Sequence, residues 1–150
     1  MSVKHRGQGA TQVSDAGHGS LPHTADVRVE AWAPSREQCV AEAVAGMVAA
    51  FADVSAAEAT ETVRVRIDGT TNEDVLVGAL DEVIYLLDTR GLVPVATEVE
   101  ADDDALTVCF TMADAERVPA IGAVPKAVSL HDLRFERRDG GWRCAATLDV

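Results

Sequence analysis

Alternation of apolar and polar residues between His23 and Trp32 constrains the fold more than any other feature of the sequence. An extended chain directs successive side chains to opposite faces. Every second residue from His23 to Ala31 therefore lies on one face, which is mainly apolar. Every second residue from Thr24 to Trp32 lies on the other face. The segment predicts a strand with a buried face and an available polar face, on which Asp26 stands early.

Two other segments repeat their apolar residues with the period of an α-helix. The first follows Ser35, which together with Gln38 forms a capping-box pattern, and we expect this helix to end around Asp53. The second follows a similar pattern at Thr71 and stops at Gly91. Each is expected to be an amphipathic helix with one apolar stripe.

The remaining ordered segments predict strands. They are Val63–Ile67, a hairpin of Thr97–Glu100 and Leu106–Thr111, and a C-terminal hairpin of Lys126–Arg138 and Trp142–Val150. The apolar phase of Lys126–Arg138 slips by one residue near His131 and Asp132, which predicts a β-bulge there. The order of elements favours an α+β fold in which two helices pack on a mixed or antiparallel sheet.

Composition sets the domain organisation. A chain of 150 residues with 47% hydrophobic residues fits one domain with a real core. Residues 1–17 are rich in Gly, Ser, Gln and charge and show no periodicity. We therefore expect a disordered tail over 1–17 and a single domain over 18–150.

The charge and the cysteines of the chain indicate which partners and which cellular location to expect. A formal net charge of -12 disfavours direct nucleic-acid binding and is compatible with a basic protein partner or a metal ion. No apolar run approaches the ~20 residues of a membrane span, and no secretory signal is recognisable, so no membrane association and a cytoplasmic location are expected. The three cysteines show no Cys-x-x-Cys spacing and are expected to be buried thiols.

Carboxylates near both ends of the domain form the candidate site. Asp26 and Asp149 lie on the polar faces of the first and last predicted strands, and Val150 would add its main-chain carboxylate. If these strands meet, the three groups offer hard oxygen ligands, which suit calcium, magnesium or manganese rather than zinc. The sequence leaves three roles open for His131, as a metal ligand, a general base or a structural histidine. Lys126 is by default a solvated lysine.

Several motifs occur together in a fixed order along the chain. They are Gly17-His18, Pro22–Val27, Asp74–Asp88 followed by Thr89-Arg90-Gly91, Lys126–Leu133, Gly141-Trp142 and Leu148–Val150. In this combination the sequence resembles the archease family over nearly the whole chain from about Gly17. Archeases are small acidic proteins that assist the RtcB-type ligase of tRNA splicing and RNA repair.

The resemblance implies an α+β fold with a barrel-like sheet and two helices. It also implies a divalent metal, calcium in structures of the family, held by residues that match Asp26, Asp149 and Val150. Archeases speed formation of the guanylylated histidine intermediate of the ligase, allow multiple turnover and broaden its nucleotide use. A non-catalytic role as activator of such a ligase is therefore expected here.

The resemblance also marks candidates for contact with the ligase, namely His23, Lys126 and His131. Lys126 and His131 match a lysine and a histidine of one family motif, in which Ser129-Leu130 replaces the usual Thr-Tyr. This replacement keeps the hydroxyl group and loses the aromatic ring, which bears on partner contacts rather than on the metal ligands.

Two alternatives remain at this point. A metal-assisted hydrolase would use Asp26, Asp149 and His131. The sequence lacks the Ser/His/Asp order, a Gly-rich phosphate loop and a second histidine for a tight catalytic metal. A general chaperone or scaffold module would be expected to expose a large apolar run, which the sequence does not contain.

Overall fold

The structure is a computed structural model that describes residues 3–8 and 26–150. In chain order its elements are β1 (Val3–Gln8), β2 (Asp26–Ala33), α1 (Arg36–Ala49), β3 (Ala59–Asp68), α2 (Asn72–Arg90), β4 (Leu92–Asp102), β5 (Ala105–Asp114), a 3-10 turn (Ala115–Arg117), β6 (Ala127–Arg138) and β7 (Gly141–Asp149). The predicted α+β class is confirmed.

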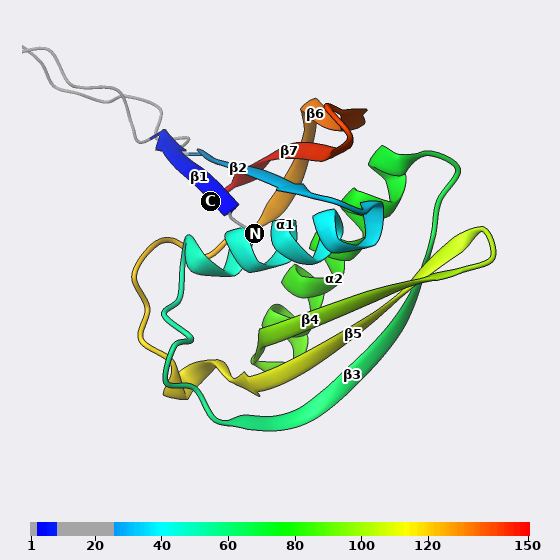
Figure 1. Ribbon diagram of the computed structural model, residues 1–150. Coiled ribbons are helices and arrows are strands. Elements are labelled where there is room, and N and C mark those ends of the chain that lie inside the picture. The colour runs from blue at the N-terminus through cyan, green and yellow to red at the C-terminus, as the bar shows by residue number, and fades with distance from the viewer. Residues whose placement is uncertain (1–2, 9–25) are drawn as a thin grey trace, which may run out of the picture.

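The strands form two separate sheets, with the orders β1-β2-β7-β6 and β3-β5-β4. Every strand pairing in the described part of the chain is antiparallel. Both helices lie in a layer between the sheets (Figure 1), where α1 contacts β2 and β4 and α2 contacts β6 and β4. The sheets remain distinct, so the barrel-like closure implied by the resemblance is not confirmed.

Local capping explains where the helices begin. The Ser35 hydroxyl accepts a hydrogen bond from the Gln38 N–H at 3.1 Å, and Thr71 and Asp74 form a reciprocal capping box. Gly91 takes the left-handed conformation (φ 63°) that ends α2 as predicted. These caps satisfy amides and carbonyls that a helix end would otherwise leave unpaired.

The first helix ends at Ala49, earlier than the predicted end near Asp53. The chain after Ala49 pairs instead with the connection between β5 and β6. The Ile121 N–H donates to the Phe51 carbonyl at 2.9 Å, and the Asp53 N–H donates to the Pro119 carbonyl at 3.0 Å. Long-range pairing thus takes over the backbone groups that a longer helix would have used.

The core fills the space between the helices and both sheets. Its largest fully buried side chains include Met47, Leu76, Leu80, Phe110 and Leu148. Each such side chain contributes roughly 1.5–3 kcal/mol by leaving water. Because both helices have a sheet on either side, each buries a wider surface than the single stripe predicted from the sequence.

The N-terminal strand corrects one expectation. The sequence predicts disorder over residues 1–17, whereas Val3–Gln8 forms β1 and pairs with β2, Val3 opposite Ala31. An edge strand needs only backbone hydrogen bonds to its neighbour, so a polar sequence without periodicity can supply one. The predicted start of the domain at residue 18 lies outside the described residues.

Neither helix in the described part of the chain combines the length and the hydropathy that a membrane span requires.

Candidate functional site

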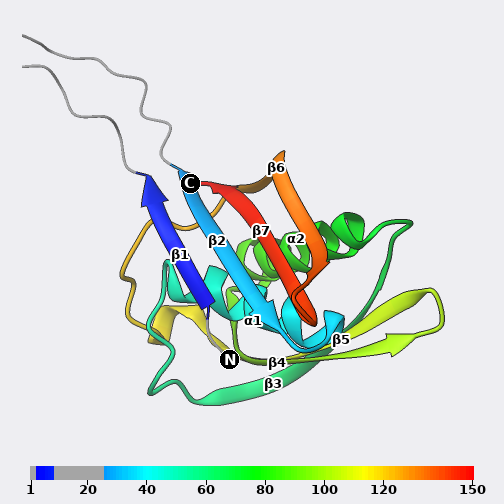
Figure 2. The same ribbon diagram turned by 45° about the horizontal axis from the view of Figure 1, so that its top comes forward.

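The strands from the two ends of the domain meet, as the sequence predicts. In the antiparallel pair of β2 and β7, Asp26 lies directly opposite Asp149. Paired residues of this kind share a face of the sheet, with Cβ atoms about 4.5–5.5 Å apart. The two carboxylates, separated by most of the chain, are therefore neighbours on the sheet face opposite to the buried Val29 and Leu148. Figure 2 shows this sheet in front of the helices.

The third strand of the site is β6, which flanks β7 on its other side. Ala127 is the partner of Asp149 in this pairing, and the Lys126 N–H donates to the Asp149 carbonyl at 2.7 Å. The small side chain of Ala127 leaves space beside the aspartate pair. Backbone hydrogen bonds from both neighbours thus fix the end of β7, and Val150 follows directly.

In the described part of the chain, no Lys or Arg side chain pairs directly with either aspartate. Neither Asp26 nor Asp149 forms a salt bridge there, and Asp149 is exposed while Asp26 is half-buried. Like charges directly opposite each other destabilise a strand pair. A bound cation would relieve this repulsion, so the donor set fits a divalent metal.

The side chains alone do not complete such a site. Among the described residues, no group of three or more His, Cys, Asp or Glu side chains is placed to hold a metal ion. The main-chain carboxylate of Val150 is the additional protein oxygen expected beside Asp26 and Asp149. Calcium takes 6–8 oxygen ligands, so water or a partner would supply the others.

The next row of the same face contains a residue that the sequence reasoning missed. Arg28 donates from Nη1 to Thr147 Oγ1 at 3.0 Å and from Nη2 to the Asp132 carbonyl at 3.2 Å. Its guanidinium thereby joins β2, β7 and the irregular part of β6. The available signal was its position in phase with Asp26 on the polar face of the strand.

The predicted bulge in β6 is confirmed. The register of β6 against β7 shifts between Ser129 and Arg134, and Asp132 has a positive φ of 56°. Ser129 Oγ accepts a hydrogen bond from the His131 N–H at 3.1 Å. The family-matched hydroxyl at Ser129 thus helps to shape the bulge.

The other candidate residues identified from the sequence lie near this bulge or outside the described residues. The His131 side chain is 89% exposed, with Nε2 3.9 Å from Asp132 Oδ2. Lys126 is exposed beside the aspartate pair. His23 lies outside the described residues. In the described part His131 makes no hydrogen bond or salt bridge to Asp26 or Asp149, so the arrangement gives no support to the hydrolase alternative.

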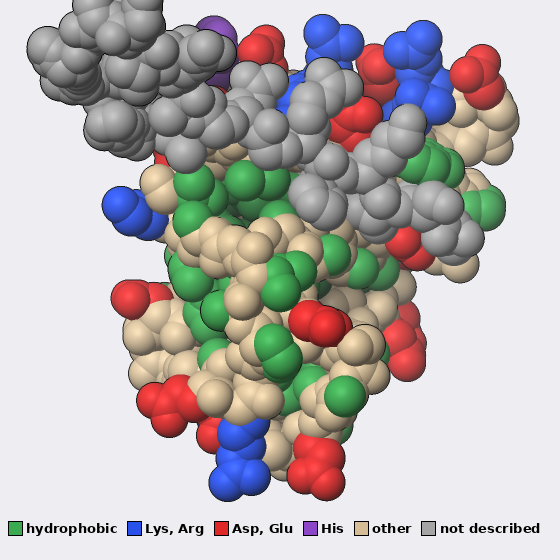
Figure 3. Space-filling view, turned by 90° about the vertical axis from the view of Figure 1, so that its left-hand side faces the viewer, with side chains coloured by type: hydrophobic (Ala, Val, Ile, Leu, Met, Phe, Trp, Pro, Cys, Tyr) green, Lys and Arg blue, Asp and Glu red, His purple; other side chains and the backbone are tan. Residues whose placement is uncertain are grey.

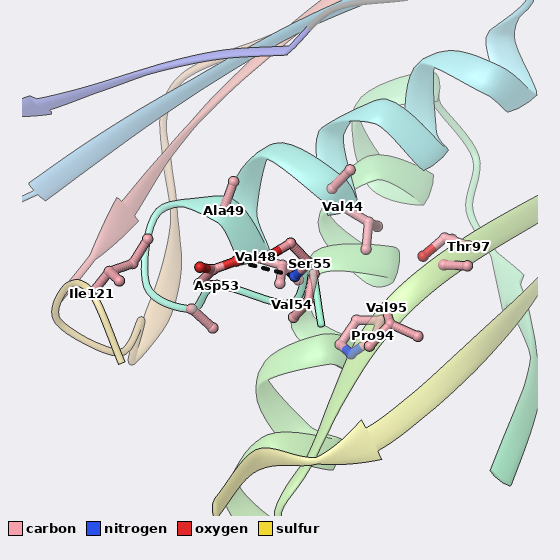
Figure 4. Close-up of a pocket in the computed structure, with 13 residues that line it drawn as sticks. Val44, Val48, Ala49, Asp53, Val54, Ser55, Pro94, Val95, Thr97 and Ile121 are labelled. Atoms are coloured by element: carbon pink, nitrogen blue, oxygen red, sulfur yellow. Dashed lines mark hydrogen bonds between the residues drawn. The ribbon is translucent and has the colours of Figure 1, made fainter. Parts of the chain in front are cut away.

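An apolar pocket of about 400 Å³ is separate from these residues (Figure 4). It lies between α1, the turn after α1 and the start of β4. Asp53 accepts hydrogen bonds at its edge from the Ser55 hydroxyl at 2.6 Å and N–H at 3.0 Å, which hold the pKa of Asp53 below its usual value. Figure 3 shows apolar side chains gathered on this side of the molecule, between the levels of the two sheets.

Comparison with known proteins identifies the family. The sequence model of the Archease protein family (MTH1598/TM1083) matches residues 19–150. The chain is 49% identical over 137 residues to the probable protein archease of Mycobacterium tuberculosis H37Rv, covering 91% of this chain and 76% of that protein. It is 27% identical over 132 residues to the protein archease of Archaeoglobus fulgidus, covering 87% and 96%. The chain therefore belongs to the archease family.

Solved structures share the fold. The solution structure of protein 1598 of Methanobacterium thermoautotrophicum has a TM-score of 0.67 at 24% identity and covers 88% of this chain and 96% of its own. The crystal structure of an archease from Thermotoga maritima, described as a possible chaperone, also has a TM-score of 0.67, at 22% identity, and covers 91% and 100%. At these identities the similarity concerns the fold.

Proposed function

We propose that this chain is a non-catalytic activator of an RtcB-type ligase of tRNA splicing and RNA repair, acting in the cytoplasm. It promotes guanylylation of the ligase histidine and so supports multiple turnover. Membership of the archease family supports the proposal. The single structural observation that carries it is the cross-strand pairing of Asp26 with Asp149.

In this proposal a divalent metal, calcium or alternatively magnesium or manganese, is held by Asp26, Asp149 and the carboxylate of Val150. When bound, the metal supplies positive charge that attracts phosphate oxygens. The chain itself positions the two aspartates through the ladder of β2, β7 and β6 and leaves their outer face open to a partner.

Docking on the ligase would place this face near the nucleotide pocket. The bulge of β6 supplies a contact surface with His131 and with Leu130, whose side chain is 74% exposed. Lys126 and His23 complete the proposed contacts. An activator that binds the guanylylation-competent state of the ligase more tightly than other states shifts the ligase toward that state.

The test is RNA ligation by the RtcB-type ligase of the same source at limiting ligase, with GTP and manganese. We expect the wild-type chain to convert single turnover to multiple turnover. Asp26→Ala and Asp149→Ala should abolish this effect. Asp104→Ala is the matched control, because it removes one exposed carboxylate from the β4–β5 turn, on the other sheet.

Formation of the guanylylated ligase, measured with labelled GTP, separates activation from later steps. It should rise with the wild-type chain and with Asp104→Ala, and stay at its basal level with the two site variants. Full activation by Asp26→Ala would refute the role of the metal site. No effect of the wild-type chain on guanylylation or turnover would refute the activator role itself.

A further inference from the structure

The outer face of the β1-β2-β7-β6 sheet carries a cationic depression in an otherwise acidic chain. Its volume is about 150 Å³, and its charged lining residues are Arg28, Glu30, Arg134, Glu136, Arg138 and Arg143. Ala145, which is 8% exposed, lies between the flanking strands, opposite Glu30 on β2 and Arg134 on β6. Because its side chain is short, the longer side chains around it enclose a hollow.

The two glutamates do not neutralise the four arginines. Glu30 lies 3.9 Å from Arg28, and Glu136 lies 3.4 Å from Arg138. Arg134 and Arg143 are exposed and form no salt bridge with any described residue. Two guanidinium groups thus remain available, and guanidinium is the side-chain group best shaped to bind phosphate oxygens in pairs.

Both tryptophans of the chain border the same region. A second hollow, of about 610 Å³, shares Trp32, Arg138 and Arg143 with the first and adds Trp142. The Arg143 guanidinium lies 5.9 Å from the centroid of the Trp32 ring. Joined through these shared residues, the two hollows form a groove, which we name the arginine–tryptophan groove.

We propose that the arginine–tryptophan groove binds single-stranded nucleic acid, here probed as RNA, with phosphates at Arg134 and Arg143 and a base at Trp32. Arginine beside an aromatic ring is a combination by which proteins hold single strands, since the guanidinium meets phosphate and the ring stacks on a base. The Trp32 ring is half-buried beside Arg143. An acidic protein segment would use the arginines but would leave Trp32 without a role. The net charge of -12 argues against nucleic-acid binding only when charges are spread evenly, and here they are not.

The groove is distinct from the aspartate pair, although both lie on one sheet face. Its binding of RNA is a property of the isolated chain and does not depend on the ligase. Failure of the ligase assay and failure of RNA binding are therefore separate results.

Fluorescence anisotropy of a labelled single-stranded RNA oligonucleotide at low salt tests the proposal. The wild-type chain should bind it, and Arg134→Ala/Arg143→Ala should bind at least tenfold more weakly. The plot of log K against log salt concentration should also lose about 1.4 of its slope for two phosphate contacts. Arg64→Ala/Arg66→Ala, which removes the same charge from β3 on the other sheet, should bind like wild type.

A second measurement addresses Trp32 directly. In a Trp142→Phe background Trp32 is the only tryptophan, and its fluorescence should be quenched by the single strand. Circular dichroism confirms that each variant is folded. The proposal is overturned if wild type does not bind the RNA, if the Arg134/Arg143 variant binds it as tightly as wild type, or if polyglutamate displaces it at equal charge concentration. Equal affinity for double-stranded RNA would refute base stacking and overturn it as well.

Discussion

The Sγ atoms of Cys39 and Cys144 lie 3.4 Å apart, between the first turn of α1 and the middle of β7. Both thiols are free and buried. Their contact joins the helix layer to the strand that carries Asp149. The contact with Cys39 and the burial both raise the pKa of the Cys144 thiol.

Chemical labelling should distinguish the three cysteines. Thiolate is the reactive form, and Cys39 and Cys144 have almost no exposed surface, so native protein should be alkylated first at Cys109, which is half-buried. Mass spectrometry after a short iodoacetamide pulse measures this directly. Denaturation in guanidinium should make all three sites react at similar rates. Rapid native labelling of Cys144 would contradict the burial described for it.

Alkaline pH should destabilise the protein through the same thiol. The unfolded chain loses the Cys144 proton above the ordinary pKa of 9.0, whereas the folded chain retains it. The contribution of this thiol to stability is therefore complete below that pH and is lost above it, at about 1.4 kcal/mol per pH unit for one proton. Urea denaturation across this range measures the slope. Cys144→Ala should reduce the slope by this one-proton contribution, and Cys109→Ala should leave it unchanged.

Calcium should stabilise the folded chain if the aspartate pair binds it. A ligand at a hundredfold excess over its Kd adds about 2.7 kcal/mol. The expected result is a rise in Tm with calcium for wild type and for Asp104→Asn. Asp26→Asn and Asp149→Asn should show no rise, although their own Tm in chelator should match or exceed that of wild type because the repulsion between the carboxylates is removed.

Removing the cap of α2 should cost stability without changing the site. Thr71→Ala deletes the side chain that accepts from the Asp74 N–H, with an expected loss of about 1 kcal/mol. Urea denaturation provides the measurement. Thr70→Ala changes the adjacent exposed threonine and should stay within about 0.5 kcal/mol of wild type. Equal losses in both variants would show that the cap is not the cause.

Gly78 should resist substitution although it lies within a helix. Alanine is favoured over glycine in a helix by about 1 kcal/mol, but a Cβ at position 78 would meet Ile67 Cγ2 at 2.6 Å. We therefore expect Gly78→Ala to lower the free energy of unfolding by about 1–3 kcal/mol.

A double-mutant cycle identifies the cause. Ile67→Ala removes the Cγ2 group, so Gly78→Ala should be neutral or stabilising in that background. A loss of the same size in both backgrounds would place the effect of Gly78 elsewhere.

Local signals in the sequence were sufficient for much of this architecture. The caps at Ser35 and Thr71 and the stop at Gly91 depend on residues a few positions apart, and all three are found where they were predicted. The bulge near His131 was recognisable because a slip of one residue moves every later side chain to the opposite face.

Features that depend on distant partners could not be read locally. The sequence shows that β2 and β7 each have a polar face, and the pairing of Asp26 with Asp149 could be expected from their positions at the strand ends. The groove could not, because Arg134, Arg143 and Trp32 come from three strands and meet only when the register is fixed. The edge strand β1 has no apolar pattern at all.

The pairing of β2 with β7 also sets the order in which the protein can mature. During synthesis Asp26 is made early and its partner Asp149 at the end of the region that matches the family. Contacts so distant along the chain form late, since closing the intervening loop costs entropy. A nascent or prematurely terminated chain that contains α1, α2 and the β3-β5-β4 sheet but not β7 has no aspartate pair. The aspartate pair therefore assembles only after translation has reached β7.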